Sequence, residues 1–98
     1  RENMQGRIEN VYLLRIINKD QHAHTYTLEA TGLNGLTLES KQNFKVQAGE
    51  IFSSPVSISV EPEDLTSSTN QIQFTVRSAD DERIERTSKS TFIGPVIR

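Results

Sequence analysis

Apolar residues recur at every second position in several short stretches of the chain. The clearest are Tyr12, Leu14 and Ile16, then Tyr26, Leu28 and Ala30, then Val56, Ile58 and Val60, and finally Ile72, Phe74 and Val76. Successive side chains of an extended chain leave opposite faces, so each stretch has one apolar and one polar face. The pattern predicts β-strands that each bury one face in a hydrophobic core.

Turn residues divide these stretches into short strands. The fifth strand is expected to begin after Pro55, which lacks a backbone donor, and the acidic segment 61–65 predicts one helical turn. About seven strands at intervals of about 8–12 residues are typical of an immunoglobulin-like β-sandwich with antiparallel strands, so the predicted fold class is all-β. The predicted strands are residues 8–18, 24–31, 36–39, 43–46, 56–60, 71–78 and 83–92.

A length of 98 residues fits one domain. We expect residues 1–7 to be a linker or a frayed first strand, residues 8–95 the immunoglobulin-like domain, and residues 96–98 a tail. Because the chain starts at Arg1, it is expected to be a piece of a longer protein. It contains no cysteine, so the predicted core is held without a disulfide, by aliphatic and aromatic packing alone.

The charges argue against two classes of partner. Eleven basic residues are scattered among 13 acidic ones, for a net charge of −2, whereas nucleic-acid-binding proteins usually carry a basic face. No apolar stretch approaches the roughly 20 residues that a membrane-spanning helix needs. We therefore predict no nucleic-acid binding and no direct membrane insertion of this segment.

Two groups of side chains are candidates for metal binding. His22 and His24, with Met4 as a further candidate, have the spacing to share one face and bind copper, but two solvated turn histidines are the simpler interpretation. The acidic residues 80–82 could bind calcium, but a charged, solvated hairpin tip is the simpler interpretation. The acids in segment 61–65 are likewise interpreted as solvated. We predict no metal site, with His22 and His24 as the copper candidates.

No catalytic motif is present. Ser, His and Asp all occur, but the Gly-x-Ser-x-Gly elbow is absent, and nothing singles out a carboxylate pair for glycoside hydrolysis. Tyr12 and Tyr26 fall on apolar faces, where core tyrosines with a hydrogen-bonded hydroxyl at the rim are more usual than ligand-stacking residues. No catalytic or cofactor-binding residue is predicted, and the segment is not expected to be an enzyme.

Several short sequence segments, taken in their order, resemble the C-terminal domain of the FixG/CcoG family, the accessory proteins of cbb-type cytochrome c oxidase. The resemblance runs from residue 6 to residue 95, although Leu13 stands where a polar residue is expected. The segments are IENVY at residues 8–12, INKDQ at 17–21, HTY at 24–26, GL at 32–33 and STFIGP at 90–95.

The resemblance implies an immunoglobulin-like domain on the periplasmic side of an inner-membrane protein. By this resemblance, the parent protein would have several transmembrane helices and cysteine-ligated iron–sulfur clusters. It would assist oxidase assembly by handling and reducing copper. None of the cluster-binding cysteines lies in this segment, so no functional residue is transferred and no cofactor is expected here.

The expected function is that of a non-catalytic interaction or scaffolding domain. Its partner would be a protein of the cell envelope, such as an oxidase assembly factor, bound through a sheet face or an exposed strand edge. Two alternatives stay open: a copper-binding module that uses His22 and His24, and a generic extracellular adhesion-type sandwich.

Overall fold

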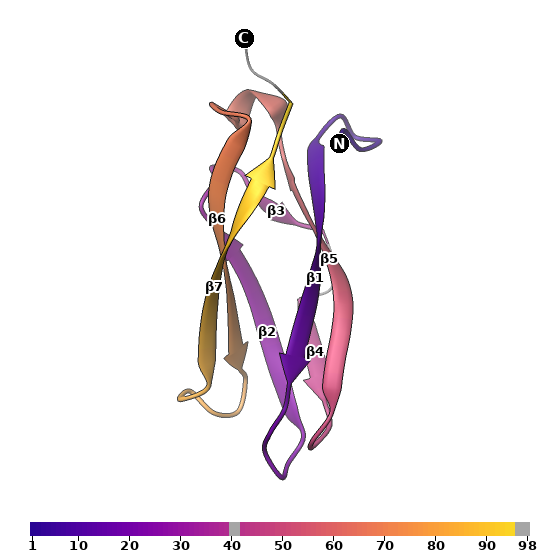
Figure 1. Ribbon diagram of the computed structural model, residues 1–98, viewed down its shortest axis with the longest axis vertical. Helices are drawn as coiled ribbons and strands as arrows, with labels where there is room; N and C mark the ends of the chain where they lie inside the picture. Colours follow the sequence, from indigo (N-terminus) through magenta and orange to yellow (C-terminus); the bar gives the residue numbers. More distant parts are fainter. Residues whose placement is uncertain (40–41, 96–98) are drawn as a thin grey trace.

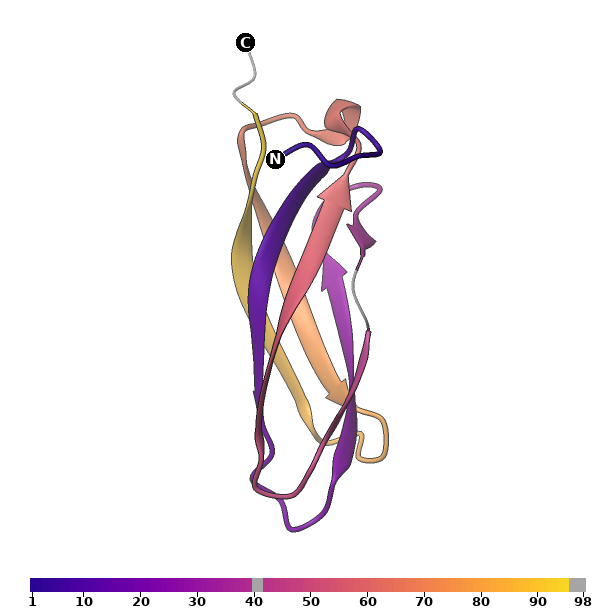
Figure 2. The ribbon, with the colours of Figure 1, turned by 90° about the vertical axis from the view of Figure 1, so that its right-hand side faces the viewer.

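The computed structural model describes residues 1–39 and 42–95, so the predicted tail at residues 96–98 lies outside the described residues. It contains two antiparallel sheets packed into a sandwich, one with strand order β1-β5-β3 and one with strand order β4-β2-β6-β7 (Figures 1 and 2). The strands are β1 (Ile8–Ile17), β2 (His24–Thr31), β3 (Thr37–Leu38), β4 (Asn43–Val46), β5 (Ile51–Val60), β6 (Thr69–Ser78) and β7 (Glu85–Ile93). The predicted all-β sandwich with seven strands is confirmed.

The fifth strand begins earlier than the sequence predicts. β5 starts at Ile51 and runs through Pro55, pairing with β1 along its whole length and placing Pro55 opposite Leu13. β3 pairs with β5 only opposite Ile58 and Ser59. Among the described strands, Pro55 therefore has a neighbour on one side only, and an edge position tolerates the missing N–H group.

The other strand ends match the prediction or differ from it by one or two residues, and β6 begins at Thr69 instead of residue 71. Two features of the segments between strands have local causes. The predicted helical turn is present as a 3₁₀ turn at Pro62–Asp64, closed by the Leu65 N–H donating to the Pro62 carbonyl at 3.1 Å. The last strand begins at Glu85 instead of residue 83, because the Ile84 N–H turns back to the Asp81 carbonyl at 3.0 Å. The hairpin loop is correspondingly longer than the predicted four residues.

Because apolar and polar residues alternate along the strands, apolar side chains from both sheets fill the space between them. Side chains from both sheets are buried there, and Tyr12 meets Phe74 edge to face with ring centroids 5.0 Å apart. The core therefore needs no covalent staple, as the absence of cysteine requires. The buried apolar residues are Ile8, Ile16, Tyr26, Leu28, Phe44, Val46, Val56, Ile58, Val60, Leu65, Ile72 and Phe92.

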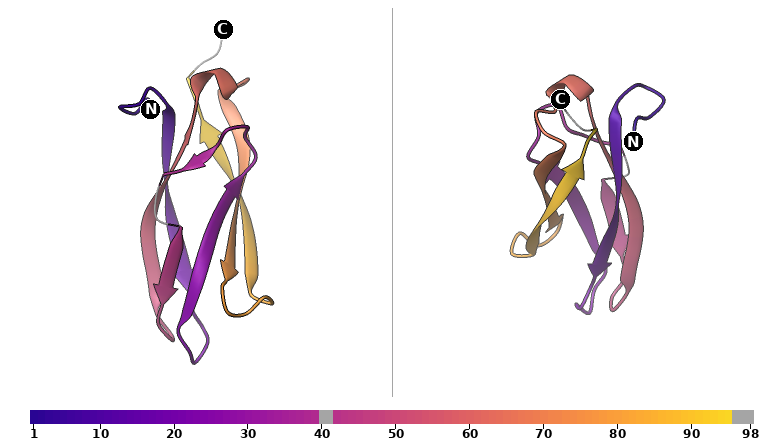
Figure 3. Two further views of the ribbon diagram at one scale, coloured as in Figure 1. Left: turned by 180° about the vertical axis from the view of Figure 1, so that it is seen from behind. Right: turned by 45° about the horizontal axis from the view of Figure 1, so that its top comes forward.

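One glycine allows the chain to leave β2 and cross to the other sheet. Gly32 has a φ of 122°, and a Cβ there would lie 2.8 Å from the Gln71 carbonyl oxygen and 2.9 Å from the Ile72 Cα. Both neighbours are backbone atoms of β6, so they cannot swing aside. Seen from behind, the chain passes from β2 to the short β3 and returns to β4 beside β2 (Figure 3).

β1 and β7 are the facing edges of the two sheets, and side chains rather than a backbone ladder join them. The Asn10 amide donates from Nδ2 to the Ile93 carbonyl at 2.9 Å and accepts from the Ile93 N–H at Oδ1, also at 2.9 Å. The Tyr12 hydroxyl donates to the Thr91 carbonyl at 2.8 Å, and burial raises the pKa of Tyr12 to about 12. The predicted rim hydroxyl is thus confirmed for Tyr12.

Replacing Asn10 by Ala removes both hydrogen bonds of this join at once. Each hydrogen bond contributes a net of about 0.5–1.5 kcal/mol, so we expect Asn10→Ala to lower the free energy of unfolding by about 1–2 kcal/mol in urea denaturation. Asn43→Ala is the matched control, because Asn43 is also on a strand, but among the described contacts its side chain accepts only one weak bond, from Thr27 Oγ1 at 3.2 Å. Equal losses in the two variants would contradict a special role for Asn10.

Candidate functional site

A buried histidine joins two loops at one end of the sandwich. His24 opens β2 and has only 5% of its surface exposed, because the alternation of β2 turns it inward with Tyr26 and Leu28. Its Nε2 lies 2.8 Å from an Asp20 carboxylate oxygen, and its Nδ1 lies 2.9 Å from Asp80. Since a ring nitrogen must carry a proton to donate, the two carboxylates together favour the doubly protonated imidazolium.

The charges of this cluster reinforce one another. The hydrogen bonds that His24 donates to Asp80 and then to Asp20 raise the pKa of His24, against an opposing effect of burial. The pKa of Asp80 is lowered by the Ser78 hydroxyl and by His24, and that of Asp20 by His24 and the Gln21 N–H. The cluster therefore ties the β1–β2 loop to the β6–β7 loop through a charged clamp.

The structure separates the two copper candidates. His22 is exposed in the turn before β2, where its backbone carbonyl accepts from Asn18 Nδ2 at 2.8 Å. His24 is buried with both ring nitrogens engaged, so its interpretation as a solvated turn histidine is wrong. A metal ion at His24 would have to displace one of the two carboxylates. Within residues 1–39 and 42–95, no three His, Asp or Glu side chains are grouped to hold a metal ion.

Ser78, His24 and Asp80 come together, but not in the geometry of a nucleophilic triad. A triad places the nucleophile and the orienting carboxylate on different ring nitrogens of the histidine. Here the Ser78 hydroxyl donates to Asp80 at 2.6 Å, both face Nδ1, and Asp20 holds Nε2. Ser78 is also buried. The arrangement serves to hold loops together.

The acidic run at the hairpin tip is engaged by neighbouring groups. Asp80 belongs to the clamp, and Asp81 accepts from the Arg83 guanidinium at 3.0 Å, which lowers the pKa of Asp81. Glu82 is exposed. These contacts support the predicted charged hairpin tip over a calcium site, because the carboxylates point to different partners.

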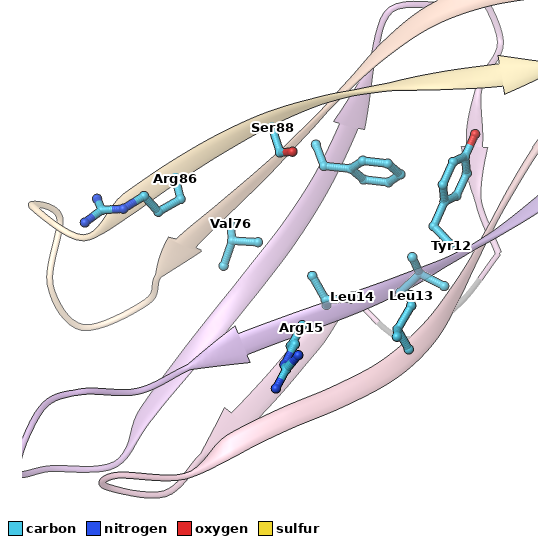
Figure 4. Close-up of a pocket in the computed structure, with 9 residues that line it drawn as sticks. Tyr12, Leu13, Leu14, Arg15, Val76, Arg86 and Ser88 are labelled. Atoms are coloured by element: carbon cyan, nitrogen blue, oxygen red, sulfur yellow. The ribbon is translucent and has the colours of Figure 1, made fainter.

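A groove opens between β1 and β7 beyond the contact that Asn10 and Tyr12 make. The two strands diverge from this contact toward the far end (Figure 1), and a groove of about 320 Å³ lies between them. A second hollow of about 200 Å³ continues it toward Tyr26 and Ile84, and the two share Arg15, Val76 and Arg86. Residues that line the first are Tyr12, Leu13, Leu14, Arg15, Val56, Phe74, Val76, Arg86 and Ser88 (Figure 4).

A second apolar surface lies on the outer face of the β1–β5 pair. Val11, Leu13 and Ile17 point outward from β1, and Leu13 is 72% exposed. Opposite them on β5 are Pro55, across from Leu13, and the exposed Ile51, across from Ile17. These five residues are called here the outer stripe, and they settle the face of Leu13. The polar pair Arg15 and Ser53 interrupts the stripe between Leu13 and Ile17. Exposed apolar side chains gathered on one sheet face are typical of interaction surfaces.

Sequence reasoning missed the groove and its two arginines. Alternation placed Tyr12, Leu14, Phe74 and Val76 on inward faces, but it did not show that the edges of β1 and β7 are left unpaired and apart there. One signal was present: Ser88 and Ser90 leave the last strand poor in apolar side chains, and β7 is exposed along most of its length.

A sandwich of two antiparallel sheets with this strand order and no disulfide is an immunoglobulin-like domain. The family model described as "IG-like fold at C-terminal of FixG, putative oxidoreductase" matches residues 1–95, so the chain belongs to this family, as the resemblance implied. The crystal structure of a FixG-related protein from Vibrio parahaemolyticus is similar, with a TM-score of 0.85 and 35% identity over 91% of this chain and 81% of that chain. A comparison with curated proteins gave no match.

The clamp predicts a specific pH dependence of stability. The folded-state pKa of His24 lies above its ordinary 6.5, so its contribution is complete below pH 6.5 and is lost as pH rises through the raised value. The pKa values of Asp20 and Asp80 lie below 3.8, so their contribution is lost only as pH falls through those lowered values. We expect the free energy of unfolding to fall as pH rises above 6.5.

Urea unfolding between about pH 5 and pH 9 tests this, with two histidine variants for comparison. His24→Gln should remove the fall above pH 6.5, whereas His22→Gln, which changes the exposed histidine, should keep it. A fall of the same size in His24→Gln and in the unsubstituted protein would show that the clamp does not cause it.

Calorimetric titration with Cu(I) and Cu(II) tests the copper alternative. We expect no binding tighter than micromolar, because both nitrogens of His24 hold carboxylates and His22 offers a single ligand. Tighter binding that disappears in both His22→Gln and His24→Gln would contradict this expectation and restore the copper-module hypothesis.

Proposed function

We propose that this chain is a non-catalytic protein-interaction domain in the periplasm, part of an inner-membrane iron–sulfur protein that assists assembly of cbb-type cytochrome c oxidase. In this proposal the redox chemistry belongs to other parts of the parent protein, since the chain has no cysteine to ligate a cluster. The domain contributes a docking surface for another envelope protein.

The outer stripe is the observation that carries the proposal. Its side chains are apolar and exposed on a regular sheet, where a domain that faced only water would have polar residues. The groove between β1 and β7 adds a second apolar surface that is next to an open strand edge. Within the described residues no helix is long and apolar enough to cross a membrane.

Family membership supports the placement in the parent. The family description puts this fold at the C-terminus of FixG, which it calls a "putative oxidoreductase". A β-domain with exposed apolar surfaces next to a redox protein is well suited to bring that protein to its target. The periplasmic location and the role in oxidase assembly are proposed from the resemblance of the sequence segments to the FixG/CcoG family.

Affinity capture of the full-length parent from membranes tests the proposal. We expect deletion of residues 1–95 to remove oxidase subunits or assembly factors that the intact parent captures, and Leu13→Glu to weaken their capture. The control is Thr87→Glu, which makes the same charge change on exposed β7 of the other sheet. A parent without this domain that keeps all its oxidase-assembly partners would overturn the proposal.

A further inference from the structure

We propose that the groove between β1 and β7 binds an extended peptide segment, with apolar residues at alternate positions and acidic residues between them. This inference rests on the proposed function, because it names the chemistry of a partner for an interaction domain. Three observations carry it: two open strand edges, an apolar floor, and two arginines without acidic partners.

The strand edges supply the backbone complementarity. β1 pairs with β5 on one side and β7 pairs with β6 on one side. In the described chain no backbone hydrogen bond joins β1 to β7, and only the side chains of Asn10 and Tyr12 bridge them. Past Tyr12, the edges of both strands are open to an added strand, which would bond to them through its own backbone.

The floor of the groove suits alternating apolar side chains. Tyr12, Leu14 and Val56 come from one sheet, and Phe74 and Val76 come from the other. Of these, Tyr12, Leu14 and Val76 are labelled in Figure 4, where they point into the space between the strands. Because every second side chain of an extended peptide points the same way, such a peptide would place alternate residues on this floor. The groove follows β1 from Tyr12 to Ile17, which sets an occupant of about six residues.

The charges at the rim define the third requirement. Arg1, Arg7, Arg77 and Arg83 each form an ion pair with a carboxylate. The remaining two arginines in residues 1–39 and 42–95 both border the groove. The Arg15 side chain, which leaves β1 on the same outward face as Leu13 and Ile17, has no polar contact, and the Arg86 guanidinium donates only to the Glu85 carbonyl at 2.9 Å.

No Asp or Glu lines either part of the groove. The site therefore carries two positive charges and no negative one, in a domain whose net charge is negative. Carboxylates on the bound segment would provide the partners that the two guanidinium groups lack, because arginine binds carboxylates through paired N–H groups. A basic segment would be repelled at the same place.

The test compares two capped peptides of about six residues, one alternating valine with glutamate and the other alternating valine with lysine. Binding to this 98-residue chain is followed through backbone amide shifts in NMR titrations. We expect the glutamate peptide to bind at least about tenfold more tightly than the lysine peptide. The largest shifts should fall in residues 12–17 and 85–90, and binding should weaken with added salt.

Charge reversal at the rim provides the variant test. Arg15→Glu combined with Arg86→Glu should abolish the preference for the glutamate peptide, and unchanged unfolding in urea would show that the fold is kept. Lys89→Glu is the control, since Lys89 is on β7 but outside the groove lining, and it should keep the preference.

Three outcomes would overturn the inference: equal binding of the two peptides, no binding of either, or shifts confined to Val11 and Ile51 of the outer stripe. Those outcomes leave the proposed function standing, because it is judged by what the full-length parent captures. Conversely, loss of the proposed function would appear as unchanged capture after deletion of the domain, whatever the peptides do.

Discussion

Where the edges of the two sheets meet, they are joined chiefly by one side chain that takes the place of a backbone group. The Asn10 carboxamide offers a donor and an acceptor in the same relation as a peptide group, and both are used by Ile93. It joins β1 to β7 where no ladder does, across 83 positions of sequence. Because this contact is at one end only, the sheets close there and stay apart beyond it, so the join also creates the groove.

The far end of the groove is held by different chemistry. Tyr26 and Ile84 line that end, and the His24 ring lies against Tyr26 with centroids 6.0 Å apart. His24 in turn ties the loops that carry Asp20 and Asp80. An amide pair fixes one end independently of pH, whereas a titratable ion cluster fixes the other. Both ends of the groove are thus held in place before anything binds. Such preorganisation lowers the entropy cost of adding a strand.

Alternation was sufficient to predict the strands because burial on one face is a local property of sequence. It predicted β2 and β4 with their observed bounds, and it failed at Pro55 because the number of neighbours of a strand is not local. The inward position of His24 was also readable, since it shares the parity of Tyr26 and Leu28. Its partner Asp80 is 56 residues away, so the clamp itself left no periodic signal.

The groove could not be predicted for the same reason, and this bears on how such surfaces arise. Arg15 and Arg86 belong to strands from opposite ends of the chain. Nothing in the sequence around either residue shows that its guanidinium lacks an ion-pair partner in the folded domain. Their lack of partners is a property of the closed sandwich, in which every other described arginine has found a carboxylate. A guanidinium loses little when it is exposed to water alone. Two such groups beside an apolar floor and open strand edges therefore cost the fold little, and they gain most when a third strand brings carboxylates to them.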